Sequence, residues 1–314
     1  MIKIALLTEA GEKVGYGHIS RIRALSYYLK KFGFKTKIFI SPQGSFEIFE
    51  DEVLFDWKLS FVEGFDFVVI DSYLASLDVY KKYAKKYAAL FFDDDFRLKY
   101  PKGIVLNGAI GAEYIYKKSE KYKYLLGERY LLLRPEFNQK KESHPENIKK
   151  ILVTLGANDI RNLSPKIVAI IKKYNEDFEI IQIITDSYKK LDDDVVYFKN
   201  LDAKNMAKVM QESDIAFSAG GQSLLELCAI GIPTLSITVA NNQKNNIAYL
   251  SKMGLTRFLG NFDDENLKES IFKNLKDLED KTTRENISKS LSEKFSFCSG
   301  ENIDFPYRDI FLHY

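Results

Sequence analysis

The stretch DIAFSAGGQSLLELCAIGIPTLSITVANNQKNNIAYL, from Asp214 to Leu250, decides how this chain should fold. A short apolar run, Ile215–Ser218, is followed by two glycines and then by a helical pattern over Leu224–Ile230. A second apolar run, Thr234–Ile237, leads to another helical pattern. Strands that alternate with helices are typical of parallel βαβ units. The stretch therefore predicts a parallel sheet whose ligand-binding loops follow its strands.

The same alternation runs along most of the 314 residues. We expect strands at Ile2–Leu7, Thr36–Ile40, Phe67–Ile70, Ala88–Phe92, Ile104–Leu106, Tyr130–Arg134, Lys150–Leu155, Glu179–Thr185, Val195–Phe198, Ile215–Ser218 and Thr234–Ile237. We expect helices at Ile19–Lys31, Leu77–Tyr87, Pro165–Lys173, Met206–Gln211, Leu224–Ile230 and Asn245–Met253. The fold class is thus α/β, with two Rossmann-like, doubly wound domains that face a cleft.

The segment PEFNQKKESHPENIKK, residues 135–150, interrupts this alternation and is the linker candidate, because it is polar, rich in lysine and contains two prolines. It separates an expected N-terminal domain over residues 1–140 from a C-terminal domain over 150–314. The aromatic end of the chain, Glu301–Tyr314, either packs back across a domain or serves self-association.

Composition limits the function classes. Hydrophobic residues make up 46% and charged residues 29% of the chain, and the formal net charge is +2. This charge argues against a nucleic-acid partner. The sequence contains no apolar run of about 18 residues, so we expect no membrane insertion. The two cysteines, Cys228 and Cys298, are too few for a disulfide framework. We expect a cytoplasmic monomer.

The first loop, TEAGEKVGYGH from Thr8 to His18, nearly matches the dinucleotide-binding fingerprint. Ser20 stands where the third glycine is needed, and no acidic residue ends the next strand. Nicotinamide binding is therefore disfavoured, and we expect no cofactor.

His18 lies where an amphipathic helix begins. The helix dipole disfavours the imidazolium there, which predicts a neutral ring with a pKa at or below its ordinary value. A neutral imidazole in a cleft can act as a general base. The residues alone leave a second interpretation open, in which His18 caps the helix or bonds to the backbone. His144 and His313 are expected at the surface.

The glycines of the opening stretch suit a diphosphate. Gly220 and Gly221 let the backbone approach a ligand, and the helix that begins near Ser223 offers free N–H groups. Glu226, one turn further, could accept hydrogen bonds from two ribose hydroxyls. The same pattern alone also fits ordinary packing and helix capping.

Taken together, the motifs resemble the UDP-sugar-handling enzymes of GT-B fold. They are most similar to the UDP-sugar hydrolases of the pseudaminic acid pathway, which act on UDP-2,4-diacetamido-2,4,6-trideoxy-β-L-altropyranose, and to spore-coat polysaccharide proteins. The motifs that carry the resemblance are GYGHISR (15–21), VVIDSY (68–73), FFDDD (91–95), VLN (105–107), LLLRPEF (131–137), VTLGANDIRNLS (153–164) and SAGGQSLLEL with GIPTLSI and NNQ.

This resemblance implies that His18 activates the water that attacks the anomeric carbon, with UDP as the leaving group. It implies substrate contacts at Gly17, Tyr73 and Asn242. It also implies a nucleotide and diphosphate site formed by Gly156, Asn158, Gly220, Gly221, Gln222, Ser223, Glu226 and Gln243. Such enzymes need no metal, so we predict none. Asp93–Asp95 are interpreted as helix-capping acids rather than metal ligands.

Two further functions remain open at this point. An inverting GT-B glycosyltransferase would use the same UDP-sugar donor and pass the sugar to an acceptor other than water. A non-catalytic sugar-nucleotide sensor would bind the same ligand without turning it over.

Overall fold

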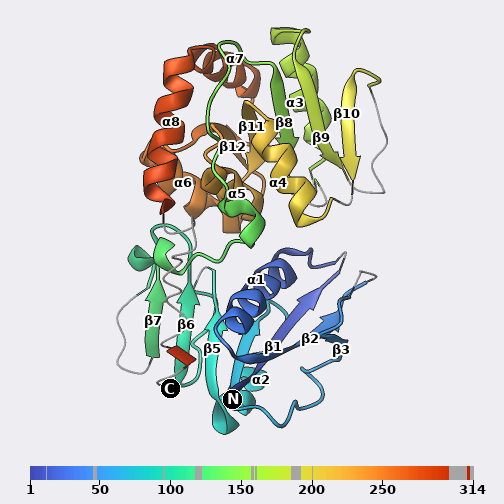
Figure 1. Cartoon of the computed structure of the whole chain (residues 1–314), viewed down its shortest axis with the longest axis vertical. Coiled ribbons are helices and arrows are strands. Elements are labelled where there is room, and N and C mark those ends of the chain that lie inside the picture. The colour runs from blue at the N-terminus through green and yellow to red at the C-terminus, as the bar shows by residue number, and fades with distance from the viewer. Residues whose placement is uncertain are drawn as a thin grey trace. The chain divides into compact units, whose positions relative to one another are not determined.

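The computed structural model forms two compact units, Met1–Arg134 with Asp304–Tyr314 and Pro135–Ile303. The structure describes residues 1–11, 13–44, 48–94, 96–116, 122–156, 159, 161–184, 192–199, 201–296 and 310–311, with the side chains of Tyr122 and Asn242 left aside. Figure 1 shows that each unit contains its own sheet and its own helices.

The first unit contains a seven-stranded sheet within the described residues, in the order β3-β2-β1-β4-β5-β6-β7, and all its strand pairs are parallel. Its strands are β1 Lys3–Ala10, β2 Lys35–Pro42, β3 Glu52–Leu54, β4 Phe67–Asp71, β5 Ala88–Phe92, β6 Gly103–Asn107 and β7 Tyr122–Leu126. Its helices are α1 Gly17–Lys31 and α2 Leu77–Lys86, with 3-10 turns η1 Ala112–Tyr114 and η2 Glu128–Tyr130.

Over its described residues, the second unit contains a six-stranded parallel sheet in the order β10-β9-β8-β11-β12-β13. Its strands are β8 Lys150–Thr154, β9 Glu179–Ile184, β10 Val195–Lys199, β11 Ile215–Ala219, β12 Thr234–Thr238 and β13 Arg257–Asn261. Its helical elements are η3 Pro135–Asn138, α3 Ser164–Tyr174, α4 Ala203–Glu212, α5 Gln222–Ile230, η4 Asn241–Gln243, α6 Lys244–Lys252, α7 Leu267–Leu278 and α8 Lys281–Lys294. The predicted pair of doubly wound parallel-sheet domains is confirmed.

Each sheet reverses its strand order beside its first strand. In the first unit β1 has β2 on one side and β4 on the other, and in the second unit β8 lies between β9 and β11. In open parallel sheets, ligands bind outside the carboxyl ends of the strands at such a reversal. The loops after β1 and β4, and those after β8 and β11, are therefore where ligand-binding residues belong.

Burial explains why the central strands read as continuous apolar runs. After Lys3 every residue of β1 is buried, as both faces of a parallel sheet are covered. Helix α1 lies against β1 and β2 and buries Ile19, Ile22, Leu25 and Leu29, which recur at helical spacing.

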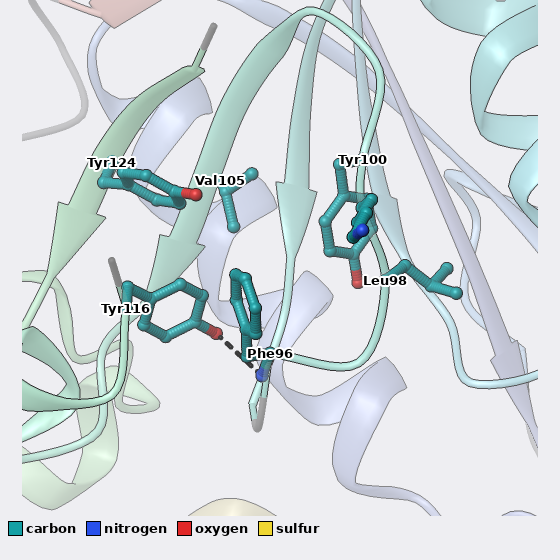
Figure 2. A pocket seen from close by; sticks show the side chains of 7 residues that line it. Phe96, Leu98, Tyr100, Val105, Tyr116 and Tyr124 are labelled. Atoms are coloured by element: carbon teal, nitrogen blue, oxygen red, sulfur yellow. Dashed lines mark hydrogen bonds between the residues drawn. The ribbon is translucent and has the colours of Figure 1, made fainter. Parts of the chain in front are cut away.

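Aromatic side chains fill one side of the first unit, including Trp57, Tyr80, Tyr83 and Phe91. A cavity of about 20 Å³ remains among the neighbouring residues Phe96, Leu98, Lys99, Tyr100, Val105, Tyr116 and Tyr124 (Figure 2). Ligand pockets are usually several hundred Å³, so this cavity has room for about one water molecule and not for a sugar.

Two boundary predictions differ from the structure. The run Tyr130–Arg134 was expected as a strand, but Tyr130 ends η2 and the next residues are irregular, although Leu132 and Leu133 are buried. The apolar pattern therefore predicted the burial of this run correctly, but it predicted a strand that does not form. The strand at this edge of the sheet is β7, which lies earlier in the chain and was not predicted.

The expected second domain of residues 150–314 also differs from the compact units at the end of the chain. Phe311 packs against Phe34 and Phe67 of the first unit, with ring centroids 5.9 and 4.6 Å apart. Ile310 and Phe311 are both buried. The described part of the tail therefore packs back onto the first unit.

The linker candidate is attached to the second unit. Lys140 Nζ donates to the carbonyl oxygens of Ala229 and Phe295, and Lys141 Nζ donates to those of Gln211 and Ser213. These carbonyls lie at the ends of helices, where cations are favoured. The lysine-rich composition here reflects helix capping and not a solvated spacer.

His144 is buried, contrary to the expected surface position. Its Nε2 lies 2.6 Å from Ser288 Oγ, and this hydroxyl donates to the Gly231 carbonyl oxygen at 2.6 Å. Since the hydroxyl proton is used there, His144 Nε2 must carry the proton that it donates to Ser288. Burial, together with the charges of Lys141 and Arg284, lowers the pKa of His144 to about 4. His313 lies outside the described residues.

Candidate functional site

His18 lies in the first turn of α1 and is buried, with 6% of its surface exposed. Its Nδ1 lies 2.7 Å from Asp71 Oδ1, and Asp71 is the last residue of β4. The His18 side chain bonds to Asp71 instead of capping the helix, so the capping interpretation of His18 is wrong. Because an ionised carboxylate only accepts, Nδ1 carries the proton and Nε2 keeps a lone pair. No described residue gives Nε2 a hydrogen-bond partner.

The electrostatics of His18 differ from the helix-dipole prediction. Burial lowers its pKa, but the charge of Asp71 and the hydrogen bond to Asp71 outweigh burial and hold the pKa above the ordinary 6.5. Near a helix end the dipole contributes about 0.3–1 kcal/mol, whereas a hydrogen bond to a buried charge contributes about 1.5–3 kcal/mol. The expected pKa at or below the ordinary value is therefore wrong.

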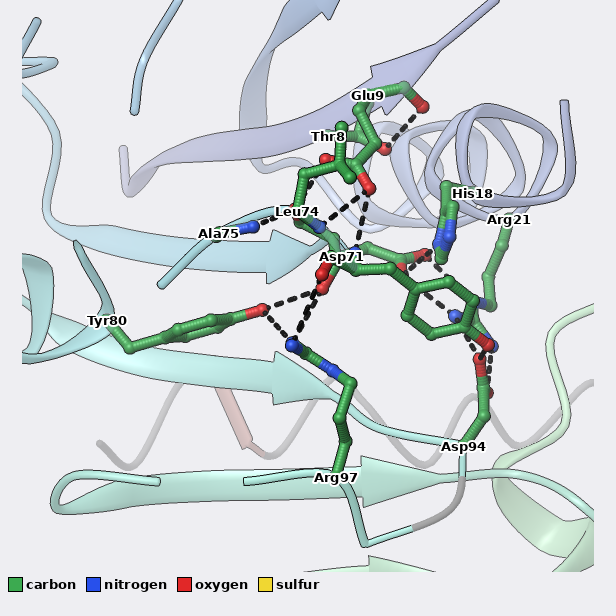
Figure 3. A network of polar contacts seen from close by, with 12 residues as sticks. Thr8, Glu9, His18, Arg21, Asp71, Leu74, Ala75, Tyr80, Asp94 and Arg97 are labelled. Atoms are coloured by element: carbon green, nitrogen blue, oxygen red, sulfur yellow. Dashed lines mark hydrogen bonds and ion pairs between the residues drawn. The ribbon is translucent and has the colours of Figure 1, made fainter. Parts of the chain in front are cut away.

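Arg21 lies one turn after His18 on the same face of α1 and joins two carboxylates. Its Nε and Nη2 donate to Asp71 at 2.8 Å each, and its Nη1 donates to Asp94 at 2.7 Å. Figure 3 shows His18 and Arg21 side by side above Asp94. Burial opposes ionisation of Asp71, yet Arg21 and His18 hold its pKa well below the usual range.

Tyr73 closes this cluster. Its hydroxyl donates to Asp94 at 2.5 Å, and its ring meets the His18 imidazole edge to face with centroids 4.4 Å apart. Tyr73 is 39% exposed, so this ring presents a surface beside the imidazole. The structure thus brings together His18 and Tyr73, two of the predicted site residues, and Gly17 precedes His18 at the start of α1.

Glu9, at the carboxyl end of β1, fixes the loop that carries Tyr73. The carboxylate accepts from the backbone N–H groups of Tyr73 and Leu74 at 2.7 and 3.1 Å and from Ser72 Oγ at 2.5 Å. From the other side, Arg97 donates to the Ser72 and Tyr73 carbonyl oxygens (Figure 3). Glu9 and Arg97 therefore hold the backbone of the loop from two sides through charge-assisted hydrogen bonds.

The acids after β5 do not cap a helix, which corrects that expectation. Asp93 accepts from the Arg97 backbone N–H and from the Tyr116 hydroxyl, and Asp94 pairs with Arg21. Asp95 lies outside the described residues. Phe96 adopts φ 60°, a conformation that costs a bulky residue about 1–3 kcal/mol. These bonds hold the loop in a shape that presents Asp94 to Arg21.

In the second unit, the turn after β11 is built by Gly220 and Gly221. A Cβ on Gly220 would lie 2.7 Å from the Ile247 side chain, whereas one on Gly221 would meet nothing within 4 Å. Gln243 Oε1 accepts from the backbone N–H groups of Gly220 and Val239 at 3.3 and 3.2 Å. Gly220 therefore serves close packing against α6, and Gly221 is the position with open space.

The remaining predicted residues that the structure describes follow β8, β11 or β12 along the chain. Gln222 and Ser223 begin α5, and Glu226, in the same helix, is 1% exposed. Gly156 follows β8, is exposed and has φ +93°, with no atom within 4 Å of an added Cβ. Asn242 lies in η4, and Asn158 lies outside the described residues.

Three residues of the cluster were not predicted as site residues from the sequence: Asp71, Arg21 and Asp94. Arg21 could have been found from its spacing to His18, and Asp71 from its place at the end of a strand beside the topological switch. Only the fold shows that they contact one another.

Over the part of the chain that the structure describes, no three His, Cys, Asp or Glu side chains are grouped as a metal site would need. No described helix has the length and apolarity to cross a membrane.

Residues 150–300 match the family model of the glycosyltransferase family 28 C-terminal domain. The whole chain aligns with the solved structure of Acinetobacter baumannii MurG at a TM-score of 0.62 and 13% identity, covering 99% of this chain and 100% of that one. This likeness is one of fold, and it confirms the GT-B class predicted from the sequence.

Two curated relatives carry the name of a hydrolase of the expected substrate. The chain is 29% identical over 234 residues to a Helicobacter pylori "pseudaminic acid cytidylyltransferase and UDP-2,4-diacetamido-2,4,6-trideoxy-beta-L-altropyranose hydrolase", covering 73% of this chain and 43% of that protein. It is 25% identical to the Campylobacter jejuni hydrolase of the same substrate name, covering 81% of this chain and 97% of that protein. It is 24% identical to the Bacillus subtilis spore coat polysaccharide biosynthesis protein SpsG, covering 82% and 83%.

The chain spans about half the length of the first two curated relatives it matches, 43% of the Helicobacter pylori protein and 55% of an uncharacterized Methanocaldococcus jannaschii protein. The predicted resemblance to the UDP-sugar hydrolases and spore-coat proteins is confirmed.

Proposed function

We propose that the protein hydrolyses a UDP-activated deoxy amino sugar at its anomeric C–O bond, in nonulosonate or surface polysaccharide biosynthesis of the pseudaminic acid type. The observation that carries the proposal is the His18–Asp71 pair at the switch point of the first sheet. The similarity to two relatives named as hydrolases of such a substrate supports the substrate class.

The chemistry follows from the tautomer of His18. With Nδ1–H donated to Asp71, Nε2 accepts a proton from water as the water oxygen bonds to the anomeric carbon. The bond between that carbon and the diphosphate oxygen breaks, and UDP leaves with the bonding electrons. A single displacement inverts the anomeric centre. Asp71 stabilises the imidazolium that forms, which is the usual role of a carboxylate hydrogen-bonded to a catalytic histidine.

The nucleotide belongs to the second unit in this proposal. The N-terminal N–H groups of α5 and the open backbone at Gly221 and Gly156 suit the diphosphate oxygens. Glu226 would accept from the ribose hydroxyls, while Asn158, Asn242 and Gln243 would complete the site. Gln222 and Ser223 supply the first N–H groups of the helix. Tyr73 and Gly17, beside His18, would contact the sugar.

The test is to incubate the purified protein with a panel of UDP-sugars in H₂¹⁸O without any acceptor. We expect UDP release for a deoxy diacetamido sugar, with ¹⁸O in the anomeric hydroxyl of the free sugar and none in UDP. Label in UDP would place the attack at phosphorus and contradict the proposal. Absence of UDP release across the panel, despite UDP binding, would contradict hydrolysis and leave the glycosyltransferase and the sensor, which an added acceptor then separates.

An inverting glycosyltransferase is the second candidate, because residues 150–300 match a glycosyltransferase domain model. It would share the nucleotide site and the base, and the acceptor hydroxyl would take the place of water. UDP release that requires an added acceptor, such as a lipid, peptide or glycan hydroxyl, would favour this function over hydrolysis.

A further inference from the structure

One oxygen of Asp71 serves two donors. Oδ1 accepts from His18 Nδ1 at 2.7 Å and from Arg21 Nη2 at 2.8 Å, while Oδ2 accepts from Arg21 Nε at 2.8 Å. The Asp71 side chain is 1% exposed, so water contributes little to its solvation. Its negative charge must therefore be balanced by one of these two side chains.

Four side chains face His18, and three of them are charged. Arg21 faces it from α1, Asp71 from β4, the Tyr73 ring from the loop after β4, and Asp94 from the loop after β5. Glu9 on β1 is directed to Ser72 and the backbone of Tyr73. With His18 neutral, Arg21 with Asp71 and Asp94 carries a net charge of −1. Without Arg21 the same group would carry −2, and only a protonated His18 could offset it.

We propose that Arg21 is the permanent counter-ion of Asp71, a positioning residue that leaves His18 uncharged and able to accept a proton. The inference rests on the proposed role of His18 as the base of hydrolysis. Arg is suited to this task because its guanidinium stays charged at any working pH and can hold two carboxylates at once. Its cation also contacts the Phe92 ring at 4.7 Å, which fixes it further.

The chain offers a matched control in the same helix. Arg23 also makes a two-point contact with a buried carboxylate, from Nε and Nη2 to Glu52 at 2.6 and 2.8 Å. Glu52 belongs to β3, and the charged groups that act on His18 are Asp71, Arg21 and Asp94. Arg23→Gln therefore removes an equivalent ion pair without changing the charge beside His18.

The experiment is an NMR titration of the histidine rings, with His18 assigned through His18→Asn. In Arg21→Gln we expect the pKa of His18 to rise by about 1 or more, since a lost like charge nearby favours the imidazolium. Asp71→Asn should lower it. Arg21→Lys, which keeps the charge, and Arg23→Gln should leave it near the wild-type value.

The kinetic consequence is a rescue by pH. Activity that Arg21→Gln loses at pH 7 should return at about pH 9, because the base form is restored there. An unchanged or lower His18 pKa in Arg21→Gln would overturn the proposal, as would an equal loss of activity at every pH. If Arg21→Gln does not fold, an unchanged His18 pKa in Asp71→Asn overturns it. If the pKa of His18 shifts as expected but the protein releases no UDP, the hydrolase function is contradicted and the counter-ion role of Arg21 is supported.

Discussion

His18 Nδ1 and Asp71 Oδ1, 53 residues apart in the sequence, lie 2.7 Å apart in the first unit. This contact fixes the tautomer of the imidazole and aims its unprotonated nitrogen away from the carboxylate. It also reverses the direction in which the pKa of His18 departs from its ordinary value. The first two predictions follow from it.

Replacing His18 with Asn keeps a hydrogen bond to Asp71 and removes the base. Turnover should fall by at least about 10²-fold, because general-base assistance contributes roughly 10²–10⁴-fold. UDP affinity, assigned to the second unit, should stay within about threefold. Rates from UDP release and affinities from calorimetry check this. A variant that keeps its rate per folded molecule would return His18 to a structural role.

The pH dependence of kcat/KM should have an acidic limb above pH 6.5. The Asp71 carboxylate raises the pKa of His18 above 6.5, and the base works only when deprotonated, so activity should be lost as pH falls through this raised value. A rate profile between pH 5 and 9 measures it. An acidic limb below 6.5 would contradict the pairing seen here.

Gly220→Ala and Gly221→Ala form a matched pair that separates packing from ligand binding. The Cβ at residue 220 would collide with Ile247 at 2.7 Å, so this variant should lose about 1–3 kcal/mol of stability. The Cβ at residue 221 meets open space. Gly221→Ala should keep its melting temperature and weaken UDP binding about fivefold or more, as expected if a ligand approaches the backbone there. Equal UDP affinity in a folded Gly221→Ala would remove that residue from the proposed site.

Glu226→Gln keeps the size of a side chain that is 1% exposed and removes its charge. If the carboxylate holds the ribose, UDP binding should weaken by roughly 1.5–3 kcal/mol, the usual loss for a charged hydrogen-bond partner. Calorimetry with UDP tests this, and Glu212→Gln on the exposed face of α4 is the control. Unchanged affinity in Glu226→Gln would leave the residue with a packing role.

His144 should make the second unit sensitive to acid. Its pKa is about 4 in the folded protein and 6.5 when unperturbed. The unfolded chain therefore binds the extra proton first, so stability is fully present above pH 6.5 and declines as pH falls toward 4. The loss should be about 1–3 kcal/mol. Urea unfolding at pH 7.5 and 4.5 gives the loss of unfolding free energy between these two pH values for wild type and for His144→Gln. An equal loss in both proteins would mean that another group is responsible.

The sequence by itself determined the architecture, because hydrophobic periodicity is local. The stretch from Asp214 to Leu250 gave strand, glycine turn, helix and strand in the order that the structure shows as β11, α5 and β12. Such short-range patterns can be recognised without knowing which residues are in contact in the folded protein. Edge elements were less visible: β3 is three residues long, and the Tyr130–Arg134 run is buried without joining a sheet.

Only the tertiary structure decided the partners of the polar residues. His18 was recognised from its position at the start of a helix, but the carboxylate that holds its ring comes from β4. The Arg21–Asp94 pair in the same cluster joins residues 73 positions apart. His144 shows the same limit, since its burial depends on Ser288 and on helix α8. Charge–charge and hydrogen-bond energies depend on distance and burial, which the fold fixes and which sequence spacing does not reveal.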